Sequence, residues 1–365
     1  MPLSVVRLPQ YERDFRDANR INLLINGDMR IAQRTVVEQS APTASTITVD
    51  RWELIKTSDA SWKIGRESAW SAAGTPFNHC LKCTVTSGAA ATISTRHVII
   101  QQRIETNFLS PARIGTVNAT PLTLSFWVFS SIPGTYIAEL RLLNVGHQIS
   151  RAYEITQANV WEYKTIIFPP NTLATLDYSN GTKYELYVMF WLAAGPSFTS
   201  DPLQTEWAGY LNASRATGQT DLGAVTDAYI AFTGVQLEPL PEPTPFIHTD
   251  YSTELRKCQR YFEHSFPGEA VPVNNRGDDA HRIMLVSGTA SNAWSGGQVY
   301  FRETKRESPD ITTWALNHAE GKVSKNGTTH QNANIQRVSP AGFAVFTQSL
   351  NTTFNLYLNW AAEAE

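Results

Sequence analysis

Charge is scarce in this 365-residue sequence: charged residues make up 17% of it, the net charge is −3, and no run of basic residues occurs. Nucleic-acid-binding proteins normally carry a basic patch, so we expect no nucleic-acid partner. Long hydrophobic runs are missing too, and none approaches the length of a membrane-spanning helix. The first residues, Met1–Arg7, lack the continuous apolar core and cleavage site of a signal peptide. We therefore expect no membrane partner, and synthesis in a cytoplasm with release by a route other than secretion.

Sequence signatures of enzymes are also missing. The chain contains no Gly-x-Ser-x-Gly, no His-Glu-x-x-His, no phosphate-binding glycine loop and no dinucleotide fingerprint. Its acidic pairs are Asp278-Asp279 and Glu363 with Glu365. They fall in expected loop or terminal positions, where contact with water leaves a carboxylate without the special reactivity of a catalytic acid or base. We expect no catalytic site and no cofactor. A glycosidase or lyase built from carboxylates distant in the sequence stays open, because such pairs leave no local signature.

Cysteine is rare, with three residues in the whole chain. Cys80 and Cys83 have the C-x-x-C spacing of metal and redox sites. The surrounding residues alternate as in a β-strand, however, and residues three apart on a strand point to opposite faces. One metal ion could not easily reach both thiols, so we expect no metal site there. Cys258 lies on an apolar helical stripe and is interpreted as a core residue.

Aromatic residues are plentiful at 11%, and short alternating segments recur between Gly, Pro and Asn-Gly turn signals. This pattern is typical of a two-sheet β-sandwich, and a jelly roll is the expected topology for residues 21–238. The segments expected to form its strands are Ile21–Ile31, Val49–Ile55, Ser61–Ile64, His79–Val85, Arg96–Gln102, Leu122–Ser130, Thr135–Leu143, Trp161–Phe168, Lys183–Leu192 and Tyr229–Leu237.

Four prolines between Pro239 and Pro245 end the last of these strands. A helical stripe follows, formed by Tyr251, Leu255, Cys258 and Phe262 at spacings of four, three and four. We interpret residues 239–268 as a stiff connector with a short helix. Residues 1–20 are polar and without a clean period, and are interpreted as an N-terminal arm.

Residues 269–365 are predicted to form a small C-terminal β domain. Its expected strands are Arg282–Ser287, Gln298–Arg302, Asp310–Leu316, Gly342–Gln348 and Thr353–Trp360. A single five-stranded sheet of this length has a thin core. The second face of the sheet could be buried against further copies of the chain, which would enlarge the core. We therefore expect an oligomer. The whole chain is thus predicted to be all-β.

Two of the expected strands carry aromatic residues on the face turned away from the core. Trp127 lies on one, and Tyr187 and Trp191 lie on the other. If the strands are neighbours, these side chains line one concave face, where aromatic rings stack on pyranose rings. Trp207, in the long polar loop 197–226, joins them as a candidate carbohydrate-binding residue. The alternative is that the arm, a loop or a partner subunit covers this face.

Three groups of residues carry a resemblance to a known family. They are Gly234-Val235-Gln236-Leu237-Glu238, then Thr244-Pro245-Phe246, then Tyr-x-x-Glu-Leu-x-x-Cys-Gln-Arg-Tyr-Phe at 251–262. With Asn22–Asp28, Asp50-Arg51-Trp52 and Leu356–Glu365, they resemble a pattern found in tail and tail-fibre-like virion proteins of phages and prophages. The resemblance covers nearly the whole chain. It implies a structural virion protein, a homotrimer by expectation, that works with other virion proteins in assembly or attachment.

The expected jelly roll is also similar to carbohydrate-binding modules. Many of these open with Asn-Gly-x-Phe-Glu and carry an Asp in the final strand, and the acids help to hold calcium. Here Arg30 stands in place of the first acid and Thr233-Gly234 in place of the second. Hard cations need oxygen ligands, so we expect no calcium site.

Two functions follow from these observations. The first is a virion protein, either a tail fibre or a fibre or decoration component, that is located in the particle and attaches to a host surface glycan. The alternative is a carbohydrate-binding module, free or part of a polysaccharide-acting enzyme.

Overall fold

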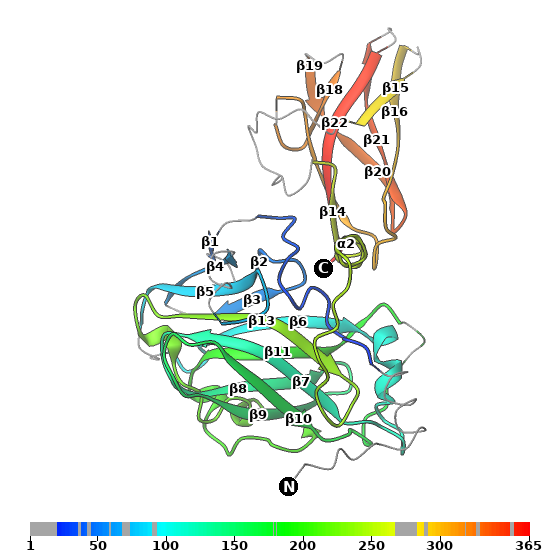
Figure 1. Ribbon diagram of the computed structural model, residues 1–365. Helices are drawn as coiled ribbons and strands as arrows, with labels where there is room; N and C mark the ends of the chain where they lie inside the picture. The colour runs from blue at the N-terminus through cyan, green and yellow to red at the C-terminus, as the bar shows by residue number, and fades with distance from the viewer. Residues whose placement is uncertain are drawn as a thin grey trace. The chain divides into compact units, whose positions relative to one another are not determined.

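The structure is a computed structural model. It describes residues 20–35, 38–41, 45–57, 60–67, 74–89, 93–177, 179, 181–266, 283–287, 291–317, 319–325, 329–350 and 354–365, with the backbone alone given for 283–287, 291–295, 348–350 and 354. The predicted N-terminal arm, up to residue 19, and Asp278-Asp279 lie outside these residues. The described secondary structure is mostly antiparallel β-sheet, so the predicted all-β class is confirmed (Figure 1). No helix in this part of the chain is long and apolar enough to cross a membrane.

The chain forms two compact units. The first contains the described residues up to Met29, those of Ser40–Thr46, and Trp52–His248. The second contains Arg30–Gln39, Ile47–Arg51 and Thr249–Glu365. Two segments of the predicted sandwich, 21–238, thus belong to the second unit. The predicted connector, 239–268, is divided between the units after His248.

The first unit is built on two antiparallel sheets. Sheet I has the strand order β1 (Gln39–Ser40), β4 (Ser61–Glu67), β5 (Cys80–Ser87), β13 (Tyr229–Glu238), β7 (Leu122–Ser130) and β10 (Glu162–Phe168). Sheet II has the order β12 (Ala208–Gly209), β9 (His147–Ile155), β8 (Gly134–Leu142), β11 (Tyr184–Ala194), β6 (His97–Glu105), β3 (Glu53–Thr57) and β2 (Ser45–Ile47). Short 3₁₀ turns lie between strands, at η1 (Thr106–Ala112), η3 (Pro196–Phe198), η4 (Asn212–Ser214) and η5 (Leu222–Ala224).

Aromatic rings from both sheets meet in the core of this sandwich. Phe190 of sheet II lies 4.9 Å from Phe126 and 4.7 Å from Phe232, both of sheet I, measured between ring centroids. All three are buried. The chain passes repeatedly from one sheet to the other, as in the predicted jelly roll. The sequence pattern missed β9, which pairs with β8 along its whole length.

The stretch Ile21–Ile31 does not form the predicted strand. It is a series of turns in which Asn26 and Met29 adopt positive φ angles of 58° and 59°, which interrupt extended backbone. It nevertheless lies along β13, because the Leu23 amide donates to the Leu237 carbonyl at 2.9 Å and the Val235 amide donates to the Gly27 carbonyl at 2.9 Å.

The proline-rich stretch after β13 folds back onto the first unit. The Glu238 carboxylate accepts from the Thr244 amide at 3.0 Å, and the Gln236 side chain accepts from the Ile247 amide at 2.8 Å. Phe246 packs edge-on against Phe77, with 4.9 Å between ring centroids. Two polar side chains of the strand and one aromatic ring therefore fix a segment whose prolines cannot donate backbone hydrogen bonds.

The second unit begins with α2 (Tyr251–Gln259), whose N-cap Asp250 accepts from the Thr253 amide at 3.0 Å. Part of the predicted helical stripe is wrong, because Tyr251 is 48% exposed and the helix ends before Phe262, which opens β14. Cys258 is buried, as predicted. Because the helix is short, the elements that pack against it decide which of its side chains are buried, and the spacing of its apolar residues does not.

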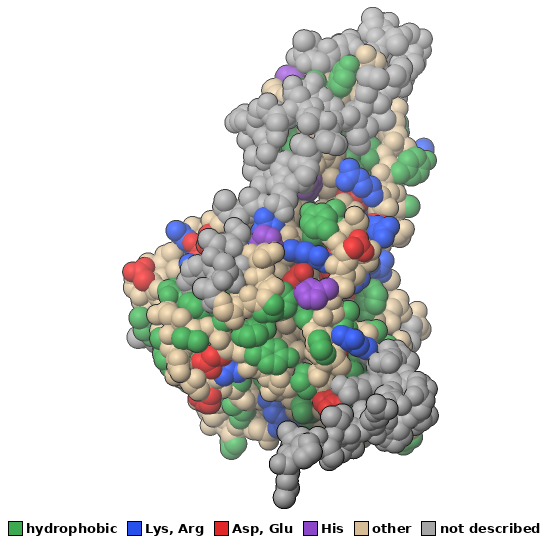
Figure 2. Space-filling view, viewed as in Figure 1, with side chains coloured by type: hydrophobic (Ala, Val, Ile, Leu, Met, Phe, Trp, Pro, Cys, Tyr) green, Lys and Arg blue, Asp and Glu red, His purple; other side chains and the backbone are tan. Residues whose placement is uncertain are grey.

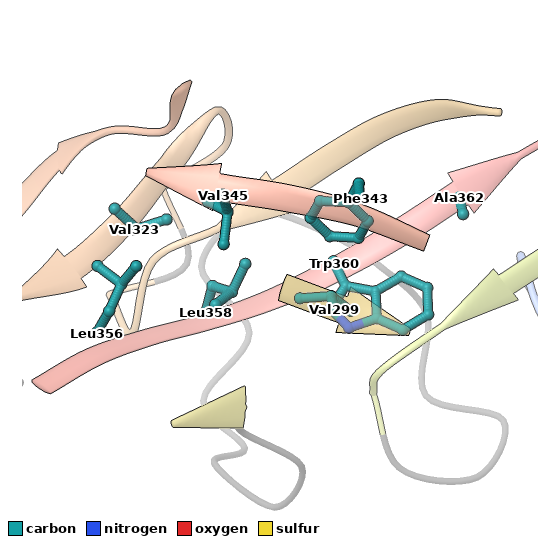
Figure 3. Packing of buried hydrophobic residues seen from close by; sticks show 8 residues of the cluster. All are labelled: Val299, Val323, Phe343, Val345, Leu356, Leu358, Trp360 and Ala362. Atoms are coloured by element: carbon teal, nitrogen blue, oxygen red, sulfur yellow. The ribbon is translucent and has the colours of Figure 1, made fainter. Parts of the chain in front are cut away.

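Two further sheets make up the rest of the second unit. Sheet III contains β14 (Phe262–His264), β15 (Ile283–Ser287), β17 (Asp310–Trp314), β18 (Lys322–Lys325), β19 (Thr329–Asn332) and β22 (Phe354–Glu363). Sheet IV contains β16 (Ser291–Tyr300), β21 (Gly342–Leu350) and β20 (Asn334–Ser339). The expectation of one thin five-stranded sheet is therefore wrong. A shared core fills the space between the sheets, formed by Val299, Val323, Phe343, Val345, Leu356, Leu358, Trp360 and Ala362 (Figure 3).

A charged cluster joins the early segments of the second unit to its last strand. Arg34 pairs with Glu363 at 2.5 Å and with Asp50 at 3.5 Å, and its guanidinium lies 4.0 Å from the centroid of the Phe262 ring. Asp50 is 1% exposed. Burial works against the charge of Arg34, but Glu363 and Asp50 outweigh it and raise the pKa of the guanidinium.

A second arginine of this cluster, Arg51, pairs with Glu365 and lies 3.5 Å from the centroid of the Tyr261 ring. Glu363 and Glu365 are thus not the freely solvated pair that their position predicted. Several residues that carry the resemblance to tail-fibre-like proteins, namely Asp50, Arg51, Tyr261, Phe262, Glu363 and Glu365, meet here. Their ion pairs and cation–ring contacts stabilise the second unit.

Candidate functional site

The four candidate carbohydrate-binding residues do not share one face. Trp127 is on β7 of sheet I, whereas Tyr187 and Trp191 are on β11 of sheet II. Because Phe126 and Phe190 point into the core, the next residue on each strand points out of the sandwich on its own side. The condition that the two strands are neighbours is therefore not met. Trp127 and the β11 pair lie on opposite outer faces of the sandwich.

The outer face of sheet I carries a row of aromatic side chains. Trp127 is half-buried and lies 5.5 Å from Tyr163 of β10, which is 46% exposed. Phe129 stacks on Tyr229 of β13 at 6.2 Å, and its ring lies 5.3 Å from that of Trp161. This face offers flat apolar area. The visible surface of the first unit is mostly uncharged side chains and backbone, as Figure 2 shows in green and tan.

On the outer face of sheet II, Trp191 is completely buried. Its indole Nε1 donates to the Glu139 carboxylate at 2.8 Å, and its ring packs 5.2 Å from that of Phe198. Arg215 donates to the same carboxylate through Nε at 2.9 Å. Phe198 and Arg215 belong to the long loop 197–226, so the alternative that a loop covers the aromatic face is correct for Trp191.

Trp207 is also buried, with 8% of its surface exposed. Its Nε1 donates to the Pro169 carbonyl at 2.7 Å, which ties the loop to the end of β10. Gln204 and Gln148 add further ties, since the Gln204 amide donates to the Gln148 carbonyl at 2.9 Å. In this structure Trp207 therefore anchors a loop and offers little surface for stacking.

Tyr187 is the predicted residue that stays partly exposed on sheet II. The strand register places it directly opposite Arg103 of β6 on one side and Arg141 of β8 on the other. These three residues are called the Arg–Tyr–Arg row below. Burial raises the pKa of the Tyr187 hydroxyl, and the nearby Arg103 charge only partly opposes this, so the phenol stays protonated at neutral pH. The row thus presents one neutral ring between two cations.

Neighbouring side chains hold both arginines in place. The Arg103 guanidinium lies 4.7 Å from the centroid of the Tyr184 ring and pairs with Glu53 at 3.5 Å. Arg141 lies 3.9 Å from the centroid of Tyr210. A guanidinium stacked on an aromatic ring loses less rotamer freedom when it binds a ligand.

Arg103 and Arg141 were not among the site residues predicted from the sequence, although strand alternation places both side chains on an outer face. Each lies at an outward position of an alternating strand, where the pattern alone says that a side chain is exposed. Which residues of three strands lie beside one another depends on how the strands pair and in which register. The alternation of apolar and polar residues gives neither. The row therefore became visible only once β6, β11 and β8 were placed side by side.

The cysteines fit structural roles. Cys80 packs with Trp161 and Ala231 on the outer side of sheet I, and burial raises the pKa of its thiol to about 12. Such a thiol is a poor metal ligand at neutral pH. Among the described residues, no group of three or more His, Cys, Asp or Glu is placed to hold a metal ion.

Arg30 and Thr233 stand where many carbohydrate-binding modules carry acids that help to hold calcium. Here both side chains donate hydrogen bonds to backbone carbonyls. The Thr233 hydroxyl donates to the His79 carbonyl at 2.7 Å, and the Arg30 guanidinium donates to the Thr249 carbonyl at 2.5 Å.

No family model and no curated protein sequence matches this chain. Solved structures with a similar fold include the enzymatically active domain of bacteriophage CBA120 tailspike protein 4, at 15% identity and a TM-score of 0.31. That match covers 60% of this chain and 21% of the tailspike, so this chain spans about a fifth of the tailspike's length.

Several carbohydrate-binding modules are also similar. TmCBM61, solved in complex with β-1,4-galactotriose, has 11% identity and a TM-score of 0.30, and the match covers 60% of this chain and 97% of the module. The family 11 module from Clostridium thermocellum, in complex with a β-1,3-1,4-mixed-linked tetrasaccharide, has 12% identity and a TM-score of 0.28, with 57% and 99% covered. Similarity at this level does not transfer identity or function to this chain.

Proposed function

We propose that this protein is a non-catalytic structural component of a tailed-phage particle, and that its N-terminal sandwich binds a surface glycan during attachment. The virion part rests on the sequence resemblance of residues 22–28, 50–52, 234–262 and 356–365 to tail-fibre-like proteins. Its partners are then other virion proteins and further copies of itself, arranged as a homotrimer. It is made in the host cytoplasm and located in the virion.

The glycan part is carried by one observation, the Arg–Tyr–Arg row on the outer face of sheet II. A tyrosine ring supplies apolar area for the face of a pyranose, and guanidinium groups supply donors for its oxygens. Few, well-placed polar groups beside an aromatic ring are typical of small-molecule binding surfaces. The stacking of Arg141 on Tyr210 and of Arg103 on Tyr184 holds these donors in place.

The outer face of sheet I supports a different role for the same protein. Tyr163 and Ile167 of β10 are 46% and 48% exposed, and Trp127 lies beside Tyr163. Exposed apolar groups in contact with one another are typical of protein–protein interfaces. We assign this face to packing between subunits in the proposed trimer, and the face of sheet II to the glycan.

Two matched variants test this assignment, Tyr187→Ala on sheet II and Tyr163→Ala on sheet I. Binding to host surface polysaccharides and to a glycan array is measured for both, with roughly micromolar to millimolar affinity expected for short sugars. We expect Tyr187→Ala to lose binding and Tyr163→Ala to keep it, with both variants folded by circular dichroism. Loss of binding in Tyr163→Ala alone would move the glycan site to sheet I.

Native mass is the test of the trimer. Light scattering after size exclusion should give three times the chain mass for the parent, and a smaller mass for Tyr163→Ala. A monomeric parent at micromolar concentration would contradict the trimer and favour an independent binding module. Release of reducing ends from a bound polysaccharide would contradict the non-catalytic assignment.

A further inference from the structure

We propose that the Arg–Tyr–Arg row selects sugars that carry a carboxylate, such as uronic acids, over neutral sugars. This inference rests on the proposed function, since it specifies which class of glycan the face of sheet II binds. It starts from Arg141, whose charge the described structure leaves without a counter-ion.

Arg141 makes no ion pair with any carboxylate in the described part of the chain. Its Nε is buried and has no hydrogen-bond partner among the described residues. Removing a cationic donor from water without a partner costs free energy, because donors lose their hydration. A bound anion beside the partly exposed guanidinium would offset that cost through its opposite charge, and a neutral hydroxyl would offset less of it.

Two carboxylates on the strands around the row, those of Glu53 and Glu139, already have cationic partners. Glu53 accepts from Gln101 at 2.8 Å and pairs with Arg103 at 3.5 Å. Glu139, completely buried, pairs with Arg215 at 2.9 Å. Both anions are thus compensated within the protein, and Arg141 keeps its positive charge for a ligand.

Arg141 is also oriented in advance. Its guanidinium stacks on Tyr210 at 3.9 Å, and the Tyr210 hydroxyl accepts from Arg215 at 3.1 Å. Arg215 is in turn fixed by Glu139 and lies 4.8 Å from the centroid of Trp191. The buried residues beneath the face, including the predicted site residue Trp191, therefore position the exposed ones.

The spacing of the row fits one sugar ring. Adjacent strands lie about 4.8 Å apart, so Tyr187 is one strand from each arginine. A pyranose stacked on Tyr187 would hold a carboxylate on its C5 within reach of one guanidinium. Two parallel N–H···O bonds between a guanidinium and a carboxylate give both strength and orientation. Since Arg103 already pairs with Glu53, Arg141 is the arginine assigned to the carboxylate.

The test compares oligogalacturonates and oligoglucuronates with their carboxyl-reduced counterparts, which have the same ring and linkage without the charge. We expect the parent to bind the acidic forms at least about tenfold more tightly at low salt, and to lose much of this preference as salt screens the charge. Arg141→Gln should remove the preference, so that acidic and reduced forms bind with the same, weakened affinity. Arg103→Gln should have a smaller effect.

Arg337→Gln is the matched control, because it removes the same charge from an exposed residue of β20 in the second unit. It should bind like the parent. Equal binding of acidic and reduced forms by the parent, unaffected by Arg141→Gln, would overturn the acid selectivity while the glycan-binding proposal stands. If the parent binds no sugar of either form or any other glycan on the array, the proposed function itself fails, and this inference with it.

Discussion

The backbone of Gly27 lies directly against the carbonyl group of Val235, so that a methyl group on Gly27 would overlap that oxygen. This contact lies where the stretch Asn22–Asp28 runs along β13, and the Val235 amide donates to the Gly27 carbonyl there. Glycine is required for this close approach of two backbones.

We expect Gly27→Ala to destabilise the first unit by about 2–3 kcal/mol, because the overlap can be relieved only by separating the two backbones. Urea denaturation followed by tryptophan fluorescence measures the change. Gly209→Ala is the control, since nothing lies within 4 Å of the added methyl group at that glycine. Equal stability of the two variants would show that the Asn22–Asp28 contact does not matter to the fold.

Trp191→Ala should destabilise the protein by about 3–5 kcal/mol, the usual cost of deleting a buried aromatic side chain. It also leaves Glu139 without the indole donor that lies 2.8 Å away. Leu173→Ala, on a side chain that is 71% exposed, should cost less than about 1 kcal/mol. Thermal unfolding compares the two. A Trp191→Ala protein as stable as the parent would mean that the long loop does not depend on this side chain.

Arg34→Met should destabilise the second unit by about 3 kcal/mol at pH 7, because the Asp50 carboxylate is then buried without its cation. The loss should shrink as the pH is lowered, because burial already raises the pKa of Asp50 and removal of Arg34 raises it further. Chemical denaturation at pH 7 and pH 5 gives both values, with Arg337→Met as the exposed control. A constant loss at both pH values would argue against a charge effect.

His264 makes the second unit sensitive to acid. Burial lowers the pKa of its imidazole from 6.5 to about 4, and the ring is 4% exposed between Phe262 and Phe266. Between these two pH values the unfolded chain binds a proton that the folded chain does not. The free energy of unfolding should therefore fall as the pH decreases from 6.5 to 4, by about 2–3 kcal/mol from this group, and level off below 4.

The variant His264→Phe removes that titration while keeping a ring of similar shape. Its stability, relative to the parent, should rise as the pH falls across the same window. Parallel pH profiles for parent and variant would show that His264 is not responsible for the acid sensitivity.

Alternation along the strands predicted the direction of side chains well. Phe126 and Phe190 were assigned to the core and Trp127 and Trp191 to the outside, and the structure agrees on all four directions. Alternation gives the face of a strand but not the sheet to which the strand belongs. The two tryptophans therefore seemed able to share one face, whereas they lie on opposite sides of the sandwich.

Long-range contacts between polar residues were beyond prediction. Arg34 lies outside the expected strands, Asp50 lies near the start of one, and their partner Glu363 lies more than 300 residues later. Nothing local in the sequence marks such a pair as buried. For the same reason Arg141, whose neighbours come from another strand and a loop, could not be told from an ordinary exposed arginine.

The second unit takes its first two segments from the N-terminal part of the chain and the remainder from Thr249 onward. During synthesis the ribosome releases Arg30–Arg51 about 200 residues before the helix and strands that complete that unit, a delay of roughly 10–40 s at ordinary elongation rates. During that time the residues that bury Asp50 and Arg34 have not yet been synthesised. The sandwich can finish folding first, and the second unit must then close around a segment that has waited in solvent. A protease that cut the chain once near His248 would not release the second unit as a complete piece.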